Sequence, residues 1–339
     1  MRIAIHGAGG LGLVLGGYLA QIGVDVIAIS RPQHVEAIRR DGLLIDGIRG
    51  RHVVTDNLTA ISSIDEIDGD IDYLILAVKA DATDLALEQA SVVLAGRVGA
   101  VLSVQNTVVK DHALAEAFGA DLVLGASTIE GGTLTGPGQV RHTATCPTTM
   151  YVGELDGTSS PRVTALAETF VSAGFGTRVT DSIEQVEWEK LMQIATAAGF
   201  SVALLPGVPW AVMADGINVR EGAEYHVALA RELLDVYRSM GYEPQDYFAP
   251  FSRFDQLAQE SVEESVQAML DMGASMKAAG LTGRASMHED VLHGRPTEVR
   301  YILGPFVERA AEAGIACPTL LATYRICTTI DTLLRSTTT

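Results

Sequence analysis

The feature that most constrains the fold of this chain is a glycine triplet between two short apolar runs near its beginning. Gly7, Gly9 and Gly12 keep the spacing G-x-G-x-x-G directly after the run Ile3–His6. A helical stretch and a second apolar run, Val24–Ile29, complete a strand–helix–strand unit of about thirty residues. In that setting Gly7 permits the tight turn, Gly9 lets the backbone approach a pyrophosphate, and Gly12 lets helix and strand pack closely.

The helix that begins after these glycines offers free N–H groups and the positive end of its dipole to phosphate groups. We therefore predict a dinucleotide-binding loop instead of the alternative, a glycine-rich turn without a ligand. The predicted loop consists of Gly7, Ala8, Gly9, Gly10, Leu11 and Gly12.

The rest of the first half alternates short β-branched runs with helical stretches, which is typical of a parallel α/β sheet. The segment 127–154, rich in Gly, Thr and Pro, predicts antiparallel strands at the edge of that sheet. The predicted strands are Ile3–His6, Val24–Ile29, Tyr73–Val78, Ala100–Val104, Leu122–Leu124 and a last strand Thr177–Val179. The predicted helices are Leu13–Ile22, Gln33–Asp41, Ala82–Leu94 and Pro161–Ala173.

From about Asp181 the apolar residues recur at helical spacing. We therefore predict an α/β fold with a Rossmann-type doubly wound sheet in residues 1–180 and an all-helical domain in residues 181–339. The tail of the chain, residues 335–339, is expected to be frayed. Three helical faces carry the prediction: Leu229, Leu233, Val236, Tyr237 and Met240; Val262, Val266, Met269 and Met276; and Val299, Ile302, Leu303, Phe306 and Val307.

Charge and composition exclude several classes of partner. The chain contains 24 Lys and Arg residues but 42 Asp and Glu residues. The resulting net charge of −18 disfavours binding to nucleic acid and to anionic membrane surfaces. No apolar run reaches the ~18 residues of a membrane span, and we expect the N-terminal run to be a strand and not a signal peptide. Cys146, Cys317 and Cys327 lack the number and spacing of a disulfide framework or a metal site. We expect a cytoplasmic protein that binds no metal.

The end of the second predicted strand indicates which dinucleotide binds. NAD enzymes tend to place Asp or Glu there, to bond the ribose 2′-hydroxyl. Here the strand ends in Ser30 and Arg31. Arg31 attracts a 2′-phosphate and Ser30 can donate to it, whereas a carboxylate would repel it. The sequence therefore favours NADP as cofactor, unless Arg31 is an ordinary solvated arginine.

Polar residues that could take part in chemistry also follow two other predicted strands and occur in the helical half. Lys79 and Asn106 each follow a buried strand, at the edge where ligands of open α/β sheets bind. Lys190 begins an otherwise apolar helix, and Glu298 lies further along the helical half. A lysine can protonate the oxyanion that forms as hydride reaches a carbonyl carbon, and a nearby carboxylate keeps it charged. Taken singly, each of these residues is more often an ordinary surface or capping residue.

Together these segments resemble the ketopantoate reductase (2-dehydropantoate 2-reductase) family. The resemblance implies an NADPH-binding Rossmann domain, a helical domain, and a 2-oxo acid substrate in the cleft between them. It also implies that Lys190 is the general acid and Glu298 orients substrate and nicotinamide ribose, while Ser286 binds the substrate carboxylate and Asn106 contacts cofactor and substrate. The matching segments are GAGGLG, SRPQH, AVKA, VQNT, GPGQVRH, EWEKL, IACPTL and SMHEDVLHGRPTEVRYILG from Ser286 to Gly304.

The chain departs from this family where the substrate would be read. The resemblance implies asparagines four and eight residues after the lysine, but these positions are Ile194 and Ala198, and a usual glycine is Thr107. Apolar residues there discriminate less well in favour of a polar substrate, although Gln193 or Thr196 could compensate. Three interpretations stay open: a ketopantoate reductase, a reductase of a more apolar 2-oxo acid, and a non-catalytic dinucleotide-binding sensor. A homodimer is compatible with the sequence, which does not itself determine the oligomeric state.

Overall fold

We describe the fold from a computed structural model, in residues 1–143, 146–250 and 252–336. The chain divides into two compact units, which we call unit 1 (Met1–Glu187) and unit 2 (Trp188–Thr339). Residues 337–339, most of the tail expected to be frayed, lie outside the described residues.

Unit 1 is built on an eight-stranded sheet, and this confirms the predicted α/β fold. Six neighbouring strands, from β5 to β8, are parallel. β11 joins β8 antiparallel, and β12 pairs parallel with β11. The strand order is β12 (Thr177–Val179), β11 (Met150–Glu154), β8 (Val123–Thr128), β7 (Val98–Ser103), β6 (Ile71–Leu76), β1 (Arg2–His6), β2 (Asp25–Ile29) and β5 (Leu58–Ile61).

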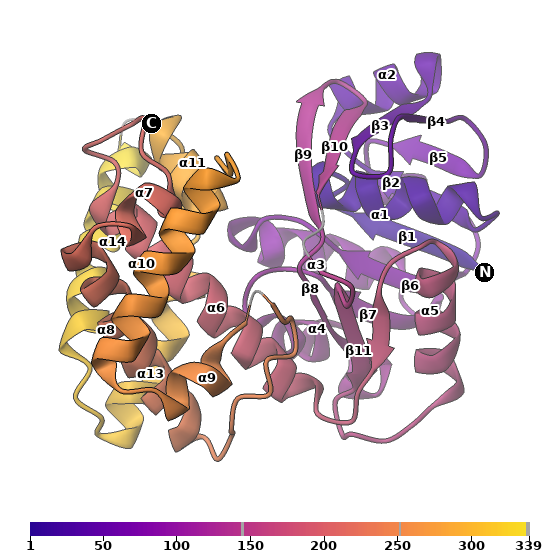
Figure 1. The fold of residues 1–339 in the computed structure, drawn as a ribbon. Helices are drawn as coiled ribbons and strands as arrows, with labels where there is room; N and C mark the ends of the chain where they lie inside the picture. The colour runs from indigo at the N-terminus through magenta and orange to yellow at the C-terminus, as the bar shows by residue number, and fades with distance from the viewer. Residues whose placement is uncertain (144–145, 251, 337–339) are drawn as a thin grey trace. The chain divides into compact units, whose positions relative to one another are not determined.

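Helices cover both faces of this sheet (Figure 1). Side chains of β1 alternate between the faces, because successive residues of a strand point to opposite sides. Ile3 and Ile5 therefore pack in one apolar core, with residues of α1 (Gly10–Gln21) and α5 (Pro161–Ser172). Ala4 packs in the other core, with residues of α3 (Thr83–Val93) and α4 (Lys110–Phe118). α2 (Pro32–Asp41) follows β2.

The prediction of edge strands in segment 127–154 was wrong for two of its three strands. β9 (Gly131–Gly136) and β10 (Gln139–Thr143) form a hairpin in a second, four-stranded sheet. β10 pairs parallel with β3 (Leu43–Gly47), which pairs antiparallel with β4 (His52–Val54). The physical reason is that β3 offers an apolar edge almost a hundred residues away, which a local pattern cannot reveal.

The regular elements of unit 2 are all helices within the described residues, as predicted. α8 packs against α7, α10, α13 and α14. The predicted helical face from Val299 to Val307 is divided between α12 and α13, because Pro305 lacks the N–H that a helix interior needs. α6 (Ile183–Leu204) begins in unit 1 and continues in unit 2. The other helices are α7 (Met213–Ile217), α8 (Arg220–Ser239), α9 (Phe254–Gln259), α10 (Val262–Ala278), α11 (Ser286–Leu292), α12 (Val299–Ile302), α13 (Gly304–Ala313) and α14 (Pro318–Ser336).

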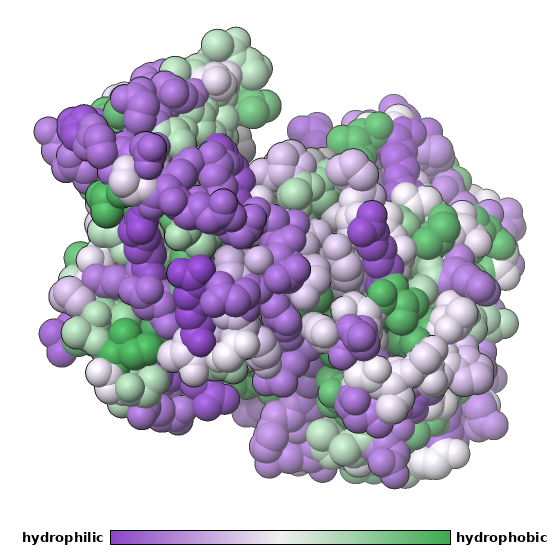
Figure 2. Space-filling model, turned by 60° about the horizontal axis from the view of Figure 1, so that its bottom comes forward, coloured by the Kyte–Doolittle hydropathy of each residue, from purple (hydrophilic) through white to green (hydrophobic). Residues whose placement is uncertain are grey.

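Among the described residues, no helix combines the length and apolar character needed to cross a lipid bilayer. Figure 2 shows hydrophilic and hydrophobic residues interspersed over one face of the molecule.

Candidate active site

The predicted cofactor residues lie where the strand order of the main sheet reverses. β1 continues to β2 on one side, whereas β6 and β7 extend the sheet on the other side. The glycine loop follows β1, and Lys79 follows its neighbour β6. In open α/β sheets the crevice at such a switch point, beyond the carboxyl ends of the strands, is the usual ligand site.

The three motif glycines serve three different steric needs. Gly7 has φ +93°, and a Cβ there would overlap Val78, 2.6 Å from its Cγ1. At Gly12 a Cβ would lie 2.9 Å from the carbonyl oxygen of Gly7, so helix and loop could not pack as they do. At Gly9 the nearest atom to an added Cβ is 3.9 Å away. Packing within the chain therefore explains Gly7 and Gly12, while open space beside Gly9 fits the close approach of a phosphate.

The amino end of α1 has the form of an anion site. In the described structure no side chain caps it, and the Leu13 N–H, donating to Gly9, makes a bond of its first turn. Ala8 holds the loop to the sheet, because its N–H donates to the carbonyl of Ile29 at 2.8 Å. Leu11 is half-buried. Gly10 has a structural role, because a Cβ there would overlap the Gly132 carbonyl at the start of β9.

Ser30 and Arg31 lie beside this loop, and their side chains differ in whether they already have hydrogen-bond partners. The Ser30 hydroxyl donates to the carbonyl of Ala8 at 2.7 Å, so its single proton braces the glycine loop. The Arg31 guanidinium is exposed and forms no hydrogen bond or ion pair with another described residue, while the Arg31 backbone carbonyl accepts the His34 N–H at 2.9 Å. Of the two predicted phosphate contacts, Arg31 is therefore the one available to a 2′-phosphate.

Gln105, which the sequence analysis missed, connects Lys79 and Asn106 at the sheet edge. Its Nε2 donates to the Val78 carbonyl at 3.0 Å and to Thr83 Oγ1 at 2.7 Å. These contacts tie the turn that carries Lys79 to the end of β7, next to Asn106. Lys79 is exposed and Asn106 is half-buried. The only signal available in the sequence was a second amide directly before Asn106.

Lys190, Ile194 and Ala198 lie on one face of α6, since residues four apart share a face of a helix. Lys190 is 5% exposed and Ala198 2% exposed, whereas Ile194 is half-buried. The two residues expected to compensate for the absent asparagines differ. Thr196 donates its hydroxyl proton to the Met192 carbonyl at 2.9 Å. Gln193 has a buried Oε1 without a hydrogen-bond partner in the described part of the chain.

Ser286 and Glu298 also belong to unit 2. Ser286 is exposed at the start of α11, and Glu298 is half-buried immediately before α12. Between them, Arg295 donates to Asp290 Oδ1 at 2.8 Å and braces the segment. His288 is fully buried, neither ring nitrogen bonds a described residue, and burial lowers the pKa of its imidazole. His288 was not predicted, because histidine is common in ordinary cores.

A buried ion cluster at the start of α6 was also missed. Lys110 Nζ contacts Asp111 Oδ1 at 3.0 Å and Glu187 Oε1 at 2.5 Å, and Glu187 also accepts the Ala126 N–H at 3.0 Å. Two carboxylates share one ammonium there. Burial and Asp111 raise the pKa of Glu187, while the two carboxylates outweigh burial and raise the pKa of Lys110. Glu187 precedes Lys190 by three residues, so this cluster anchors the helix that carries Lys190.

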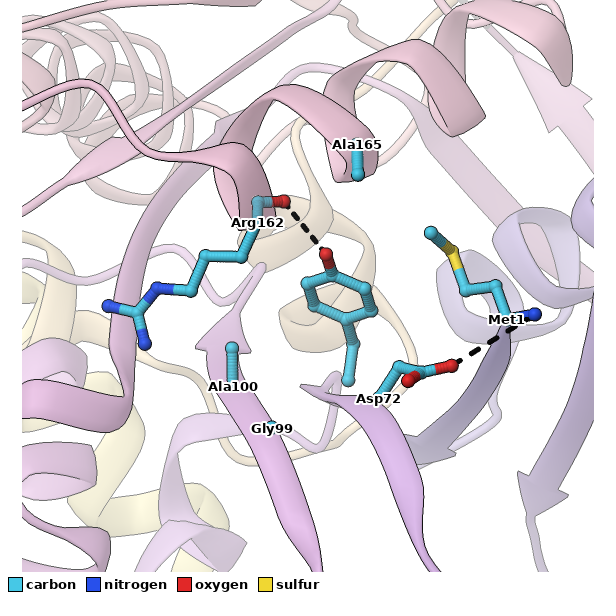
Figure 3. A pocket seen from close by; sticks show the side chains of 7 residues that line it. Met1, Asp72, Gly99, Ala100, Arg162 and Ala165 are labelled. Atoms are coloured by element: carbon cyan, nitrogen blue, oxygen red, sulfur yellow. Dashed lines mark hydrogen bonds and ion pairs between the residues drawn. The ribbon is translucent and has the colours of Figure 1, made fainter.

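A separate pocket of about 390 Å³ lies at the opposite edge of the sheet (Figure 3). Met1, Asp72, Tyr73, Gly99 and Arg162 line it, near the amino ends of β6 and β7. The guanidinium of Arg162 is bound to Glu154 through Nε at 2.8 Å and Nη2 at 2.6 Å. The amino group of Met1 pairs with Asp72 at 4.0 Å. Both cations among the lining residues are therefore paired, and the pocket lies away from the predicted residues.

Comparison with known proteins places these residues in context. A family model described as Ketopantoate reductase PanE/ApbA matches residues 3–157, and one described as Ketopantoate reductase PanE/ApbA C terminal matches residues 182–331. The 2-dehydropantoate 2-reductase of Archaeoglobus fulgidus is 30% identical over 93% of each chain. That of Halobacterium salinarum is 29% identical over 94% of this chain and 95% of its own.

Solved structures agree on the fold. The 2-dehydropantoate 2-reductase of Geobacter metallireducens superposes with a TM-score of 0.79 at 25% identity, covering 97% of this chain and 99% of its own. A D-mandelate dehydrogenase, solved with NADH and anilino(oxo)acetate, superposes with a TM-score of 0.77 at 20% identity, covering 99% and 100%.

Proposed function

Because the chain belongs to the ketopantoate reductase family, a family of oxidoreductases, we propose that it reduces a 2-oxo acid to the 2-hydroxy acid with NADPH. Ketopantoate is the first candidate substrate. The observation that carries the proposal is Lys190, an ammonium group 5% exposed on α6 in the segment that matches the family's C-terminal model. A lysine side chain so enclosed is unusual, because lysine is among the residues least often buried in folded proteins.

In the proposed reaction, bound NADPH supplies the hydride that reduces the carbonyl carbon. Lys190 donates a proton from its ammonium to the carbonyl oxygen, so that the product carries a hydroxyl group, and it regains a proton from water before the next cycle. Ser286 donates its hydroxyl to the substrate carboxylate, and Glu298 orients the substrate. Asn106 donates and accepts hydrogen bonds beside the cofactor.

The proposed cofactor contacts all belong to unit 1. The backbone at Gly9 and the N–H groups of Gly10 and Leu11 would hold the pyrophosphate, since the nearest described atom to a Cβ added at Gly9 is 3.9 Å away. Arg31 pairs with the 2′-phosphate, and Lys79 adds a positive charge at the same edge of the sheet. The uncommitted guanidinium of Arg31 supports NADP over NAD.

A second candidate function keeps this chemistry and changes the acid. Ile194 and Ala198 offer no hydrogen bonds on the face that follows Lys190, so a more apolar 2-oxo acid suits this wall better. The D-mandelate dehydrogenase shows that this fold accommodates an aromatic 2-oxo acid analogue in that protein. A branched acid such as 2-oxoisovalerate is the simplest test substrate.

The decisive experiment follows NADPH oxidation at 340 nm with ketopantoate, 2-oxoisovalerate and phenylglyoxylate. Turnover that saturates with at least one of these acids supports the proposal, and the ranking of kcat/KM decides between the two candidate functions. NADPH binding by fluorescence without turnover of any acid would contradict the enzyme assignment and favour the dinucleotide-binding sensor.

A further inference from the structure

The segment that carries Glu298 is fixed to helix α14 by a buried clamp that the proposed chemistry does not use. Thr297, the residue before Glu298, is 1% exposed, and Asp331 on α14 is fully buried. Asp331 Oδ1 accepts a hydrogen bond from the Thr297 backbone N–H at 2.6 Å and one from its hydroxyl at 3.1 Å. These residues all belong to unit 2.

Arg335, one turn further along α14, closes the clamp. Its Nε donates to Asp331 Oδ2 at 2.7 Å, and its Nη2 donates to the carbonyl of Thr297 at 3.0 Å. Burial alone would raise the pKa of Asp331, but hydrogen bonds from Arg335 and Thr297 outweigh it and hold the pKa below its usual range. Asp331 is therefore ionised at neutral pH, and its bonds to Thr297 are of the strong, charge-assisted kind.

The clamp fixes the position of Glu298 through the backbone. Consecutive Cα atoms are only ~3.8 Å apart, so the position of Thr297 sets that of Glu298. On the other side, the Glu298 carbonyl accepts the N–H groups of Tyr301 at 3.0 Å and Ile302 at 3.1 Å. The backbone that carries the Glu298 carboxylate is thus held from both directions.

We infer that Asp331 and Arg335 are positioning residues that hold Glu298 in the geometry the reaction needs, an inference that rests on the proposed function of Glu298. The clamp binds Thr297 through its backbone N–H, its backbone carbonyl and its side-chain hydroxyl. A misplacement of about 1 Å at an active site can lower the rate by about a hundredfold. Loss of the clamp should therefore affect the chemical step more than cofactor binding.

The test begins with Asp331→Asn in the full chain. The amide oxygen can still accept the Thr297 N–H, but the amide nitrogen meets the Nε–H of Arg335, so two donors oppose each other. We expect kcat to fall about ten- to a hundredfold, while the NADPH dissociation constant changes less than about twofold. Arg335→Met should repeat this result, and Arg335→Lys should restore most of the rate. The Arg335 side chain is 38% exposed, so its variants should fold.

Glu232→Gln is the matched control. Glu232 accepts the N–H groups of Thr319 at 3.0 Å and Leu320 at 2.7 Å, at the opposite end of α14. It is thus another carboxylate that binds backbone N–H groups, here from α8 to the first turn of α14 and away from Glu298. We expect Glu232→Gln to lower the thermal stability about as much as Asp331→Asn does. Its kcat should stay within about twofold of wild type.

Two readouts separate positioning from general stability. In a double-mutant cycle with Glu298→Gln, a clamp that acts through Glu298 should add less than about a threefold further loss of kcat. Hydrogen–deuterium exchange, which needs no turnover, should speed up about tenfold or more at the amides of 297–302 in Asp331→Asn and at 319–320 in Glu232→Gln.

The inference is overturned if the Asp331 and Glu298 effects multiply, if Glu232→Gln slows kcat equally, or if exchange at 297–302 is unchanged. Failure of the proposed function is a separate result, namely no turnover by the wild type. The exchange measurement still decides whether the clamp holds the Glu298 segment in that case.

Discussion

Adding one methyl group to the glycine loop should separate its structural glycine from its ligand-facing glycine. An alanine at Gly7 needs φ +93°, which costs about 1–2 kcal/mol, and its Cβ would lie 2.6 Å from Val78 Cγ1 and 2.7 Å from the Ala77 carbonyl carbon. Overpacking of this kind typically adds about 1–3 kcal/mol. We therefore expect Gly7→Ala to lower the free energy of unfolding by about 2–5 kcal/mol.

Gly9→Ala should behave in the opposite way. Its φ is −89° and its Cβ would meet nothing nearer than 3.9 Å, so the change in stability should stay within about 1 kcal/mol. The methyl group would instead fill the space assigned to a phosphate, and the NADPH dissociation constant should rise about tenfold or more. Urea unfolding measures the first quantity and NADPH fluorescence titration the second. A Gly9→Ala protein that binds NADPH as the wild type does would refute our assignment of the loop.

Three further predictions concern cofactor choice, substrate choice and pH. Arg31→Ala should weaken NADPH binding by about one to two decades and leave NADH binding unchanged, which fluorescence titration measures. Ile194→Asn combined with Ala198→Asn should shift the ratio of kcat/KM toward ketopantoate over 2-oxoisovalerate by about tenfold or more. Burial lowers the pKa of His226 to about 4, so the unfolded chain takes up its proton first as pH falls below 6.5. Folding stability should then decrease between pH 6.5 and 4 by at most about 3 kcal/mol. His226→Gln should remove this pH-dependent decrease from the free energy of unfolding measured in urea titrations.

The cofactor and pH predictions each have a control variant on the same chain. Arg40→Ala changes an exposed arginine at the far end of α2, which pairs with Asp41, and should not alter cofactor preference. Equal wild-type dissociation constants for NADPH and NADH would contradict the role of Arg31. An unchanged acid preference in the double asparagine variant would show that this face does not read the substrate. His112 has a side chain 78% exposed, so His112→Gln should leave the pH profile intact.

Sequence patterns predicted those elements whose signals lie close together along the chain. The unit from β1 to β2 was found because strand period, glycine spacing and helix start all lie within about thirty residues. The small sheet was not found, because no strand was predicted at β3 and because its pairing with β10 joins Leu44 to the distant Gln139. The break before α13 could have been predicted from Pro305, since proline is common in the first turn of a helix.

The same distinction between local and long-range features applies to the candidate site. Lys190, Ser286 and Glu298 were named because their segments resemble a family, not because spacing alone distinguishes them from surface residues. The contacts of Lys110 with Glu187, and of Thr297 with Asp331, join residues 77 and 34 positions apart. No single-sequence periodicity reports such pairs, so the residues that support the site required the structure.

The most direct test of the account is the turnover of Lys190→Ala with NADPH and the best 2-oxo acid of the panel. The chain has four lysines, and Lys277, which pairs with Asp215 at 3.0 Å, provides the control Lys277→Ala. If Lys190 is the acid, kcat should fall by about two to four decades while the NADPH dissociation constant stays within about twofold, and Lys277→Ala should match the wild type. A kcat for Lys190→Ala within tenfold of the wild-type value would contradict the central claim and move the proton donor elsewhere.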